Sequence, residues 1–528
     1  MHRVQAFSNY VRNVELGECL EGVAVMVVNV QLENFGPVKR GQFNLKNVTV
    51  FLGPPNTGKS YTAKAIYAIA ESFVYAVREL GRHREFIEDV ARGIEDVVKG
   101  LSIPSIEELG ERSTYSIISS PISIRVLGNV IIELLEHGIE KAFTRTFYSY
   151  GKRLLEKAFI SISSEELKLH LDHGKVIIDN LERIQVPAKI ELDVVGPNDE
   201  MILKYSCGAL ACRAFLPPPS FFVEKSERRR MFKEFFVERV TYAIIALTFY
   251  ELMRKTFETD IVTFIPYGRE TYSVILGLVR RRPMRTILSS SFRGMLCLLP
   301  LPIRMYLREF DTEVSYWVEE GIVQRMKRFD PNLALLIKAI LRGDVRVDEN
   351  RKIVYSDERS GIKLELFNSS AMVGGMTGLL LPLARVSRYK ANCLTIVEEP
   401  ESQLHPRYQR LIAWILALFA SSRTRIVITT HSDFLITELA IIDKLKTIDI
   451  EKAVEITRSL LDVTELKEVL SDETVKDIVE KVRSVDVAFY FFDEDGEPRE
   501  VSTNEILISI PSMVEQVSKQ LNALRELV

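Results

Sequence analysis

Three short stretches of the sequence place polar residues where strands are expected to end, and their chemistry fits phosphate and metal binding. The first follows the pattern G-x-x-x-x-G-K-[ST] and consists of Gly53, Pro54, Pro55, Asn56, Thr57, Gly58, Lys59 and Ser60, with Tyr61 next in the chain. Backbone N–H groups of such a turn wrap the outer phosphates of a nucleotide, and the following helix N-terminus favours negative charge. Lys59 would reach those phosphates and the Ser60 hydroxyl would bind Mg²⁺, whereas a plain glycine turn is the alternative.

The second stretch is an apolar segment that ends in two carboxylates. Leu394 to Val397 predict a buried strand, and Glu398, Glu399 and Pro400 follow it. Glu398 is expected to hold a water of Mg²⁺, while Glu399 points elsewhere and can orient or deprotonate the attacking water. Adjacent carboxylates raise each other's proton affinity, which suits a base. Alone, this pattern is more often a simple strand end; beside a phosphate loop it predicts catalytic acids.

The third stretch is a second buried strand that ends in a histidine. Residues 426–430 are apolar or threonine, and His431 and Ser432 come next. An isolated histidine here is more often a structural residue. Beside the γ-phosphate, His431 could instead sense the presence or loss of that group.

These residues need a sheet whose strands all end at one edge. β-Branched runs predict strands at 23–32, 42–45, 48–52, 394–397 and 425–429, and helical spacing predicts helices at 61–77 and 407–420. Hairpins are expected at 352–367 and after Asp486. Strands that alternate with helices favour an α/β fold with a mainly parallel sheet covered on both faces, and an antiparallel β-subdomain at the N-terminus.

The length of 528 residues exceeds one ordinary core. Expected divisions are an N-terminal lobe with the phosphate loop (1–80), a mostly helical insertion with one β segment at 175–195 (81–259), a strand with a helical segment (260–350), and a C-terminal lobe (351–528). Long mixed-charge stretches such as 82–98 and 131–155 indicate the insertion's helices. Neither heptads nor an internal repeat point to a coiled-coil arm.

Composition limits the compartment and the partners. The net charge of −3 makes no general case for nucleic-acid binding. Five scattered cysteines indicate no disulfide framework and favour a reducing, cytoplasmic location. The longest apolar runs, 242–250 and 411–420, are shorter than the roughly 20 residues that span a bilayer, so no membrane segment is expected.

The order of phosphate loop, glycine turn, Glu-Glu strand and strand-ending histidine resembles the ABC-type ATPases. Within them it is similar to the soluble branch of SMC, RecF and OLD-like (overcoming-lysogenization-defect) proteins, without the Toprim nuclease domain that OLD nucleases carry. The segments that carry this resemblance are Glu398-Glu399-Pro400-Glu401-Ser402-Gln403-Leu404-His405-Pro406 and Phe264-Ile265-Pro266-Tyr267-Gly268-Arg269. The motifs cover about a quarter of the chain.

The resemblance implies ATP and Mg²⁺ as cofactors and a site completed by a second subunit. Lys59, Glu399 and His431 take catalytic roles in it, and Ser60 and Glu398 hold the metal. The stretch that would cross to the partner's phosphate is 369–378, where Gly374 stands in place of the usual serine. Backbone donors of Gly375 and Met376 are expected to compensate, Ser369 or Ser370 could substitute, and a plain turn is the alternative.

Arg269 is expected either to contact the nucleotide region or to lie on the surface. The acidic turn Asp493-Glu494-Asp495-Gly496 invites comparison with metal nucleases, but a hairpin turn is favoured. Mg²⁺-dependent ATP hydrolysis by a homodimer that regulates a protein effector or a DNA transaction is the main hypothesis for function. A slowly hydrolysing, ATP-bound switch is the alternative, and a transporter motor is a third, disfavoured one.

Overall fold

The computed structural model describes residues 28–80, 114–118, 122–123, 128–195, 200–207, 210–216, 225–269, 303, 306–307, 321–348, 352–388, 392–462, 465–467 and 469–509. The chain forms two compact units. Unit 1 comprises residues 1–28 and 68–260, and unit 2 comprises residues 29–67 and 261–528. The predicted helix at 82–98 lies outside the described residues. Unit 2 therefore joins two distant parts of the chain.

A six-stranded sheet forms the centre of unit 2. Its order is β13 (Ile261–Ile265), β17 (Cys393–Glu398), β18 (Thr424–Thr429), β3 (Val48–Leu52), β19 (Val487–Phe491) and β20 (Arg499–Val501). The first five strands run parallel, and β20 pairs antiparallel with β19. All five parallel strands consequently end at one edge, which is where parallel α/β sheets bind ligands.

The pairing register aligns the strand ends that carry the expected chemistry. Glu398 of β17 lies opposite Thr429 of β18, and Leu52 of β3 lies opposite Phe491 of β19. Thr429 is in turn the partner of Phe51. The segments that carry the phosphate loop, the paired acids and the histidine thus all begin at the same edge of the sheet, within one or two residues of each other in the pairing register.

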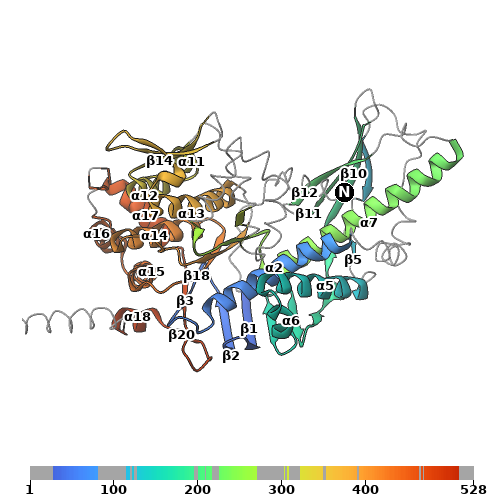
Figure 1. Ribbon diagram of the computed structural model, residues 1–528, viewed down its shortest axis with the longest axis horizontal. Helices are drawn as coiled ribbons and strands as arrows, with labels where there is room; N and C mark the ends of the chain where they lie inside the picture. Colours follow the sequence, from blue (N-terminus) through green and yellow to red (C-terminus); the bar gives the residue numbers. More distant parts are fainter. Residues whose placement is uncertain are drawn as a thin grey trace, which may run out of the picture. The chain divides into compact units, whose positions relative to one another are not determined.

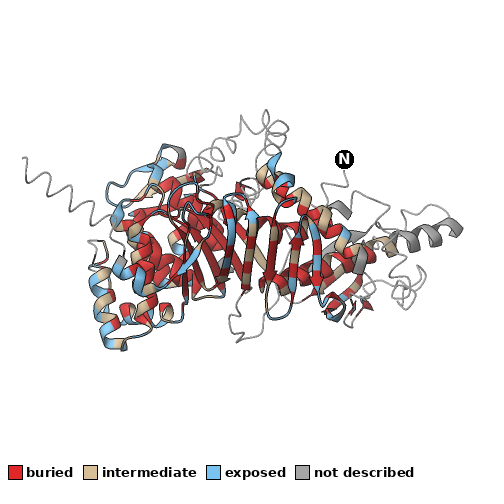
Figure 2. Ribbon diagram, turned by 90° about the horizontal axis from the view of Figure 1, so that it is seen from below, coloured by how far each residue is buried: buried red, intermediate tan, exposed pale blue. Residues whose placement is uncertain are grey.

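Both faces of this sheet are buried, which explains why its strands are almost continuously apolar. On one face Val48, Val50 and Leu52 join a core with the covering helices α12 (Pro331–Leu341), α13 (Ala371–Arg388), α14 (Pro406–Ala420), α15 (Asp433–Leu445) and α17 (Asp472–Val482). On the other, Phe51 packs on Phe43 of β2 (Val38–Leu45) and on Tyr490. Figure 1 shows α14 and α15 beside the strands, and Figure 2 shows the buried ribbons as red.

Several smaller elements complete unit 2. β1 (Val28–Phe35) and β2 are sheet neighbours joined by a short turn, as the predicted antiparallel N-terminal pair requires. β14 (Gly343–Val347), β15 (Ile353–Asp357) and β16 (Lys363–Glu365) form an antiparallel sheet, which confirms the hairpin expected at 352–367. The remaining helices are α11 (Ile322–Phe329), α16 (Ile450–Leu460) and α18 (Thr503–Ser509), while α2 (Lys59–Leu80) starts here and ends in unit 1.

Unit 1 contains more strand than the sequence predicted. Its described helices are α5 (Gly128–Phe147), α6 (Tyr150–Leu155) and α7 (Lys225–Phe257), and its strands are β4 (Thr114–Ile118), β5 (Ile122–Ser123), β6 (Phe159–Ser163), β7 (Lys168–Asp172), β8 (Lys175–Asp179), β9 (Gln185–Val186), β10 (Ala188–Val195), β11 (Glu200–Cys207) and β12 (Leu210–Leu216). In its described residues the insertion, which was expected to be mostly helical, contains both helices and strands. β8 alternates exposed and buried residues, as a half-buried strand does, and it lies in the β segment expected at 175–195.

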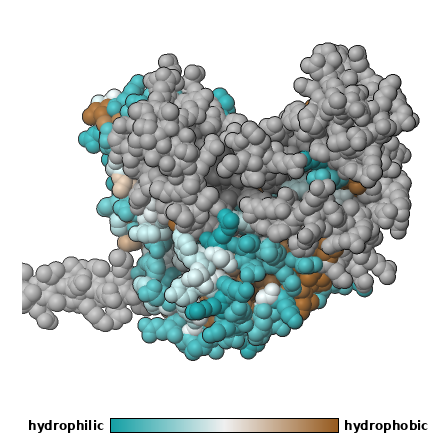
Figure 3. All heavy atoms as spheres, turned by 45° about the vertical axis from the view of Figure 1, so that its right-hand side comes forward, coloured by the Kyte–Doolittle hydropathy of each residue, from teal (hydrophilic) through white to brown (hydrophobic). Residues whose placement is uncertain are grey.

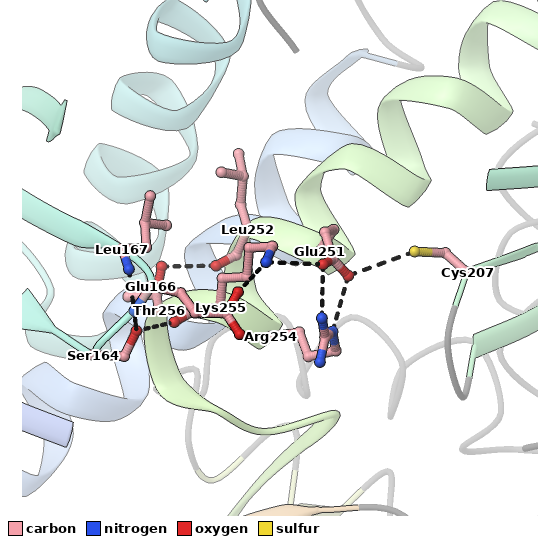
Figure 4. Close-up of polar contacts among 9 residues, drawn as sticks. All are labelled: Ser164, Glu166, Leu167, Cys207, Glu251, Leu252, Arg254, Lys255 and Thr256. Carbon is pink, nitrogen blue, oxygen red and sulfur yellow. Dashed lines mark hydrogen bonds and ion pairs between the residues drawn. The ribbon is translucent and has the colours of Figure 1, made fainter. Parts of the chain in front are cut away.

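The C-terminal end of α7 holds a buried polar network in unit 1. The Glu251 carboxylate accepts hydrogen bonds from Nε and Nη2 of Arg254, at 2.9 and 2.7 Å, and the Cys207 thiol lies 3.6 Å away (Figure 4). Lys255 pairs with Glu166, and its backbone carbonyl accepts from Ser164. Burial and Glu251 raise the pKa of Cys207 far above its usual range, so the thiol is kept protonated. The network fixes α7 against the strands of its own unit.

Among the described residues, no helix combines the length and apolar character that crossing a bilayer requires. Where Figure 3 shows described residues, most of the surface is hydrophilic, with smaller hydrophobic patches.

Candidate functional site

The phosphate loop adopts a conformation that glycine makes possible at both ends. Gly53 has a φ of +130° and Gly58 has a φ of +110°, and both values disfavour residues with a Cβ. A Cβ on Gly53 would lie 2.1 Å from the carbonyl oxygen of Phe492. The residue that follows β19 therefore lies against the start of the loop, and only glycine fits there.

Lys59 lies folded over this loop. Its Nζ donates to the carbonyl oxygens of Gly53, at 2.8 Å, and Pro54, and only 4% of the residue is exposed. Burial lowers the pKa of Lys59 to about 8, although the charge of Glu399 opposes this change. An ammonium that is poorly solvated and bonded to carbonyls is ready to exchange these contacts for phosphate oxygens.

Glu398 ends β17 as a buried carboxylate, 5% exposed. Its Oε1 accepts no hydrogen bond and lies 2.9 Å from Nζ of Lys64. A buried carboxylate whose counter-charge is a lysine ammonium can exchange that partner for a divalent ion, and Mg²⁺ takes one or two protein oxygens beside phosphate and water. The donor set of Glu398 and the Ser60 hydroxyl therefore fits Mg²⁺. Among the described residues no group of three His, Cys, Asp or Glu offers a larger metal cage.

Glu399 follows the last residue of β17, and its backbone no longer has the conformation of the strand. Its φ of +44° lies in the left-handed region, and its N–H donates to the carbonyl of Thr429 at 2.8 Å. Strain of this kind in a residue other than glycine costs about 1 kcal/mol or more and is typical of functional sites. Burial, followed by the charges of Glu401 and Glu398, raises the pKa of Glu399. That change moves the carboxylate towards the range of a general base.

His431 closes the group of side chains around the loop. Its Nε2 lies 3.9 Å from Oε1 of Glu399, and the side chain is 38% exposed. Burial and the nearby Lys59 lower the pKa of His431, while a hydrogen bond with the backbone of Gly53 works against them. The structure thus places Glu399 and His431 beside the loop, as was predicted from the sequence.

Two further residues of the site were not singled out from the sequence. Glu401 accepts hydrogen bonds from Oγ1 of Thr430, at 2.6 Å, and from the N–H of His431, at 3.1 Å. It was part of the quoted acidic segment, but its role depends on β18 lying next to β17. Lys64 follows Ser60 by four residues on α2, a spacing that puts the two on one helix face and could have drawn attention to it.

Arg269 does not lie on the surface, contrary to one of the two expectations for it. It is 1% exposed, and its guanidinium donates to backbone carbonyls of the segment that follows β17. Its planar group donates hydrogen bonds to the main chain of the paired acids and of Pro400. Its partners are carbonyl oxygens from two other parts of unit 2.

The predicted glycine turn at 369–378 is also corrected. Residues from Ala371 onwards are helical, so Gly374 and Gly375 lie inside α13 and are buried. The N–H of Gly374 bonds the carbonyl of Ser370, and the N–H groups of Gly375 and Met376 belong to the helical ladder rather than to a loop. Instead, Ser370 is exposed before the helix, and its Oγ accepts from the N–H of Val373 at 3.3 Å. The exposed donors are those of the first helical turn.

The acidic turn at 493–496 connects β19 and β20, which confirms the predicted hairpin. The carbonyl of Gly496 accepts from the N–H of Lys39 at 2.8 Å, so the turn lies against β2. Its geometry is that of a structural connection beside the sheet.

One family model matches a part of the chain. Residues 378–437, which include β17, α14 and β18, match a family described as "AAA domain, putative AbiEii toxin, Type IV TA system". No curated protein shows significant similarity to the chain.

Three solved structures are among those that match. The SMC head domain from Thermotoga maritima shares 10% identity over 90% of this chain and 99% of its own, with a TM-score of 0.30. An SmcHead bound to the C-winged helix domain of ScpA shares 11% over 90% and 97%, with a TM-score of 0.31. A Pyrococcus furiosus Smc head with an extended coiled coil, bound to the C-terminal domain of ScpA, shares 10% over 95% and 99%, with a TM-score of 0.31.

Proposed function

We propose that this P-loop ATPase of the ABC/SMC-like type binds ATP with Mg²⁺ and hydrolyses it at the edge of the unit 2 sheet. The observation that carries the proposal is the convergence of Lys59, Glu399 and His431. They come from three parallel strands that are neighbours in the sheet. In the sequence Lys59 lies more than 300 positions before both Glu399 and His431, and a plain glycine turn would not require it to meet them.

Each residue of the site has a role that its surroundings support. N–H groups from the loop 53–60 and the start of α2 would surround the phosphates, and Lys59 would exchange its carbonyl partners for phosphate oxygens. Ser60 and Glu398 would hold Mg²⁺, which offsets negative charge on the phosphates. Glu399 would orient a water and take its proton. His431, beside Gly53 and Glu399, would respond to the γ-phosphate.

The active assembly is proposed to be a homodimer with ATP between two copies of unit 2. The N-terminus of α13 is the element that would reach the partner's γ-phosphate, through Ser370 and the first N–H groups of the helix. This replaces the expected use of Gly374 and Gly375. ATP would close the dimer, and hydrolysis would open it.

The cellular role is proposed to be regulation of a protein effector or of a DNA transaction in the cytoplasm. Solved SMC heads are seen with ScpA domains bound, and a protein partner is likewise part of the proposal for this chain. The alternative is an ATP-bound switch with little turnover, and it predicts tight ATP binding without phosphate release.

Two substitutions in the full-length protein test the assignment. Lys59→Ala should weaken ATP binding at least about tenfold, because it removes a charge from the phosphates. Glu399→Gln should retain binding but lower kcat by about a hundredfold or more, because it removes the base. Equilibrium binding and phosphate release with and without Mg²⁺ measure both effects, and Lys476→Ala, on the exposed side of α17, is the matched control.

The outcomes separate the alternatives. Normal phosphate release by Glu399→Gln would contradict its catalytic role. Tight ATP binding by the unsubstituted protein, with almost no phosphate release, would favour the switch. Equal ATP binding by the Lys59→Ala and Lys476→Ala proteins would reject nucleotide binding at this loop.

A further inference from the structure

Arg269 connects two segments that the proposed function treats separately. Its Nε donates to the carbonyl of Gly375 in the first turns of α13, at 3.1 Å. Its Nη1 donates to the carbonyls of Glu398 and Glu399, at 3.1 and 3.2 Å. Its Nη2 donates to the carbonyls of Glu399 and Pro400, at 3.2 and 2.8 Å. One planar side chain therefore bonds four carbonyl oxygens from two elements.

The guanidinium of Arg269 is buried, so its hydrogen bonds cannot be replaced by bonds to water. The residue is 1% exposed, and a guanidinium has five N–H groups that must find acceptors when water is excluded. The hydrogen bonds to Gly375, Glu398, Glu399 and Pro400 supply those acceptors. The carboxylates of Glu399 and Glu401 are close enough to balance part of the positive charge. An unpaired charge at this depth would be strongly unfavourable, so the surrounding backbone is held in place.

The carbonyl groups that accept from Arg269 belong to the segment around Glu399 and to α13. Glu399 has a left-handed backbone at φ +44°, an arrangement that persists only where neighbours enforce it. Arg269 bonds the carbonyls on both sides of this residue and its own. On the other side it bonds Gly375, five residues after the exposed Ser370.

We propose that Arg269 is a positioning residue that locks the strained Glu399 segment and couples it to the N-terminus of α13. The coupling lies within one chain. A shift of α13 when it meets a partner's nucleotide would be transmitted through the guanidinium to the carboxylate that acts on the protein's own nucleotide. The inference deepens the proposed function and rests on it for the hydrolytic role of Glu399.

The chemistry of arginine is required for this task. A lysine ammonium is a compact charge with three donors, and it cannot bond carbonyls at both edges of a planar fork. Arg269→Lys should therefore behave like Arg269→Met rather than like the unsubstituted protein. Recovery of function by lysine would show that charge alone matters, and it would overturn the coupling.

The first experiment measures the lock without nucleotide. Amide hydrogen exchange of the full chain should become at least about tenfold faster in Arg269→Met at two places, the segment 399–404 and the start of α13. The reporting amides include those of Glu399, Ser402 and Leu404, which have defined backbone acceptors. Arg425→Met, which removes another buried arginine from β18 of the same sheet, should leave both places unchanged. Unchanged exchange at either place in Arg269→Met would overturn the proposal.

The second experiment separates binding from chemistry. Arg269→Met should lower kcat at least about tenfold, because a misplaced base loses alignment, while the Kd for ATP changes less than about threefold. A kcat within threefold of the unsubstituted value would overturn the proposal. If Arg269→Met does not fold, Arg269→Gln takes its place, since its amide is planar but too short to reach both elements.

The two experiments distinguish this inference from the proposed function. If the unsubstituted protein binds no ATP, or binds ATP and releases no phosphate, hydrolysis at this site is rejected and hydrogen exchange alone decides the lock. If phosphate release is normal and exchange shows no lock, the ATPase stands and the role of Arg269 falls.

Discussion

At the scale of single residues, the candidate site is governed by charges that are only partly solvated. Lys59 and Glu399 balance each other's charge, whereas the counter-charge of Glu398 is the ammonium of Lys64. Such groups respond to pH and to metal in ways that exposed residues do not. Two measurements follow from their surroundings.

The first concerns the protonation of Lys59. Its pKa is lowered from 10.5 to about 8, so the free protein loses this positive charge as the pH rises through about 8. The charged form is the one that attracts phosphate. The Kd for ATP should therefore rise between pH 7 and pH 9, approaching tenfold per pH unit above the pKa. In Lys59→Arg, which stays protonated, binding should show no such rise, and a constant Kd in the unsubstituted protein would contradict the assignment.

The second concerns the contact between Lys64 and Glu398. Nζ and Oε1 are 2.9 Å apart, and the Lys64 side chain is 33% exposed, so a modest energy is expected. Lys64→Met should lower the Mg²⁺ concentration needed for half-maximal phosphate release by roughly threefold, because the ammonium no longer competes for the carboxylate. Lys444→Met, on α15, is the control. A higher Mg²⁺ requirement would show that Lys64 assists the metal.

At the scale of elements, side-chain hydrogen bonds cap the starts of the helices that follow the strands of the sheet. His405 accepts from the N–H of Arg407 before α14, and Ser432 accepts from the N–H of Leu435 before α15. Ser432 also donates to Gln409 of α14, so the helix after the histidine is tied to the helix after the paired acids. The site therefore sits on elements whose starts are mutually constrained.

The Glu251 network is the corresponding support for α7 in unit 1. Glu251→Leu would leave Arg254 and Lys255 without this carboxylate, and local opening of α7 should become easier by about 2 kcal/mol. Native-state hydrogen exchange of residues 244–257 measures the change. Glu140→Leu, which removes an exposed pair with Lys152, should cost less than about 1 kcal/mol. Equal effects of the two substitutions would show that the buried network contributes little.

At the scale of the whole molecule, the proposed dimer makes a prediction about size in solution. Glu399→Gln should accumulate as an ATP-bound dimer, because closure is retained and hydrolysis is slow. Adding Ser370→Arg should return the molecule to a monomer while leaving the Kd for ATP within about threefold, since a bulky charge would block the α13 N-terminus. Light scattering with Mg²⁺ and ATP measures the mass.

An arginine introduced at a different surface is the control for Ser370→Arg. Ser484→Arg lies before β19, near the amino ends of the parallel strands, and should leave the Glu399→Gln dimer intact. Dimerisation unaffected by Ser370→Arg would reject the proposed use of α13.

Much of unit 2 was accessible from sequence because its signals are local. The pattern around Gly58, Lys59 and Ser60 depends on adjacent residues, and β17, α14 and β18 match their predicted ranges to within a residue or two at each end. The stretch at 369–378 was harder, since glycines favour turns. Val373 and Met376 are buried in the core, and that packing outweighs the low helix propensity of Gly374 and Gly375.

The sequence by itself determined the phosphate loop, the polar residues at the ends of the strands and the α/β class. Each of these follows from motifs of adjacent residues and from the periodicity of apolar residues. Only the tertiary structure decided that β19 lies beside β3 and that Lys64 faces Glu398. It also decided that Arg269 is buried and bonds the main chain of the paired acids. These contacts join residues from distant parts of the chain. They form because buried polar groups need partners where water is excluded, and a local sequence pattern does not identify those partners.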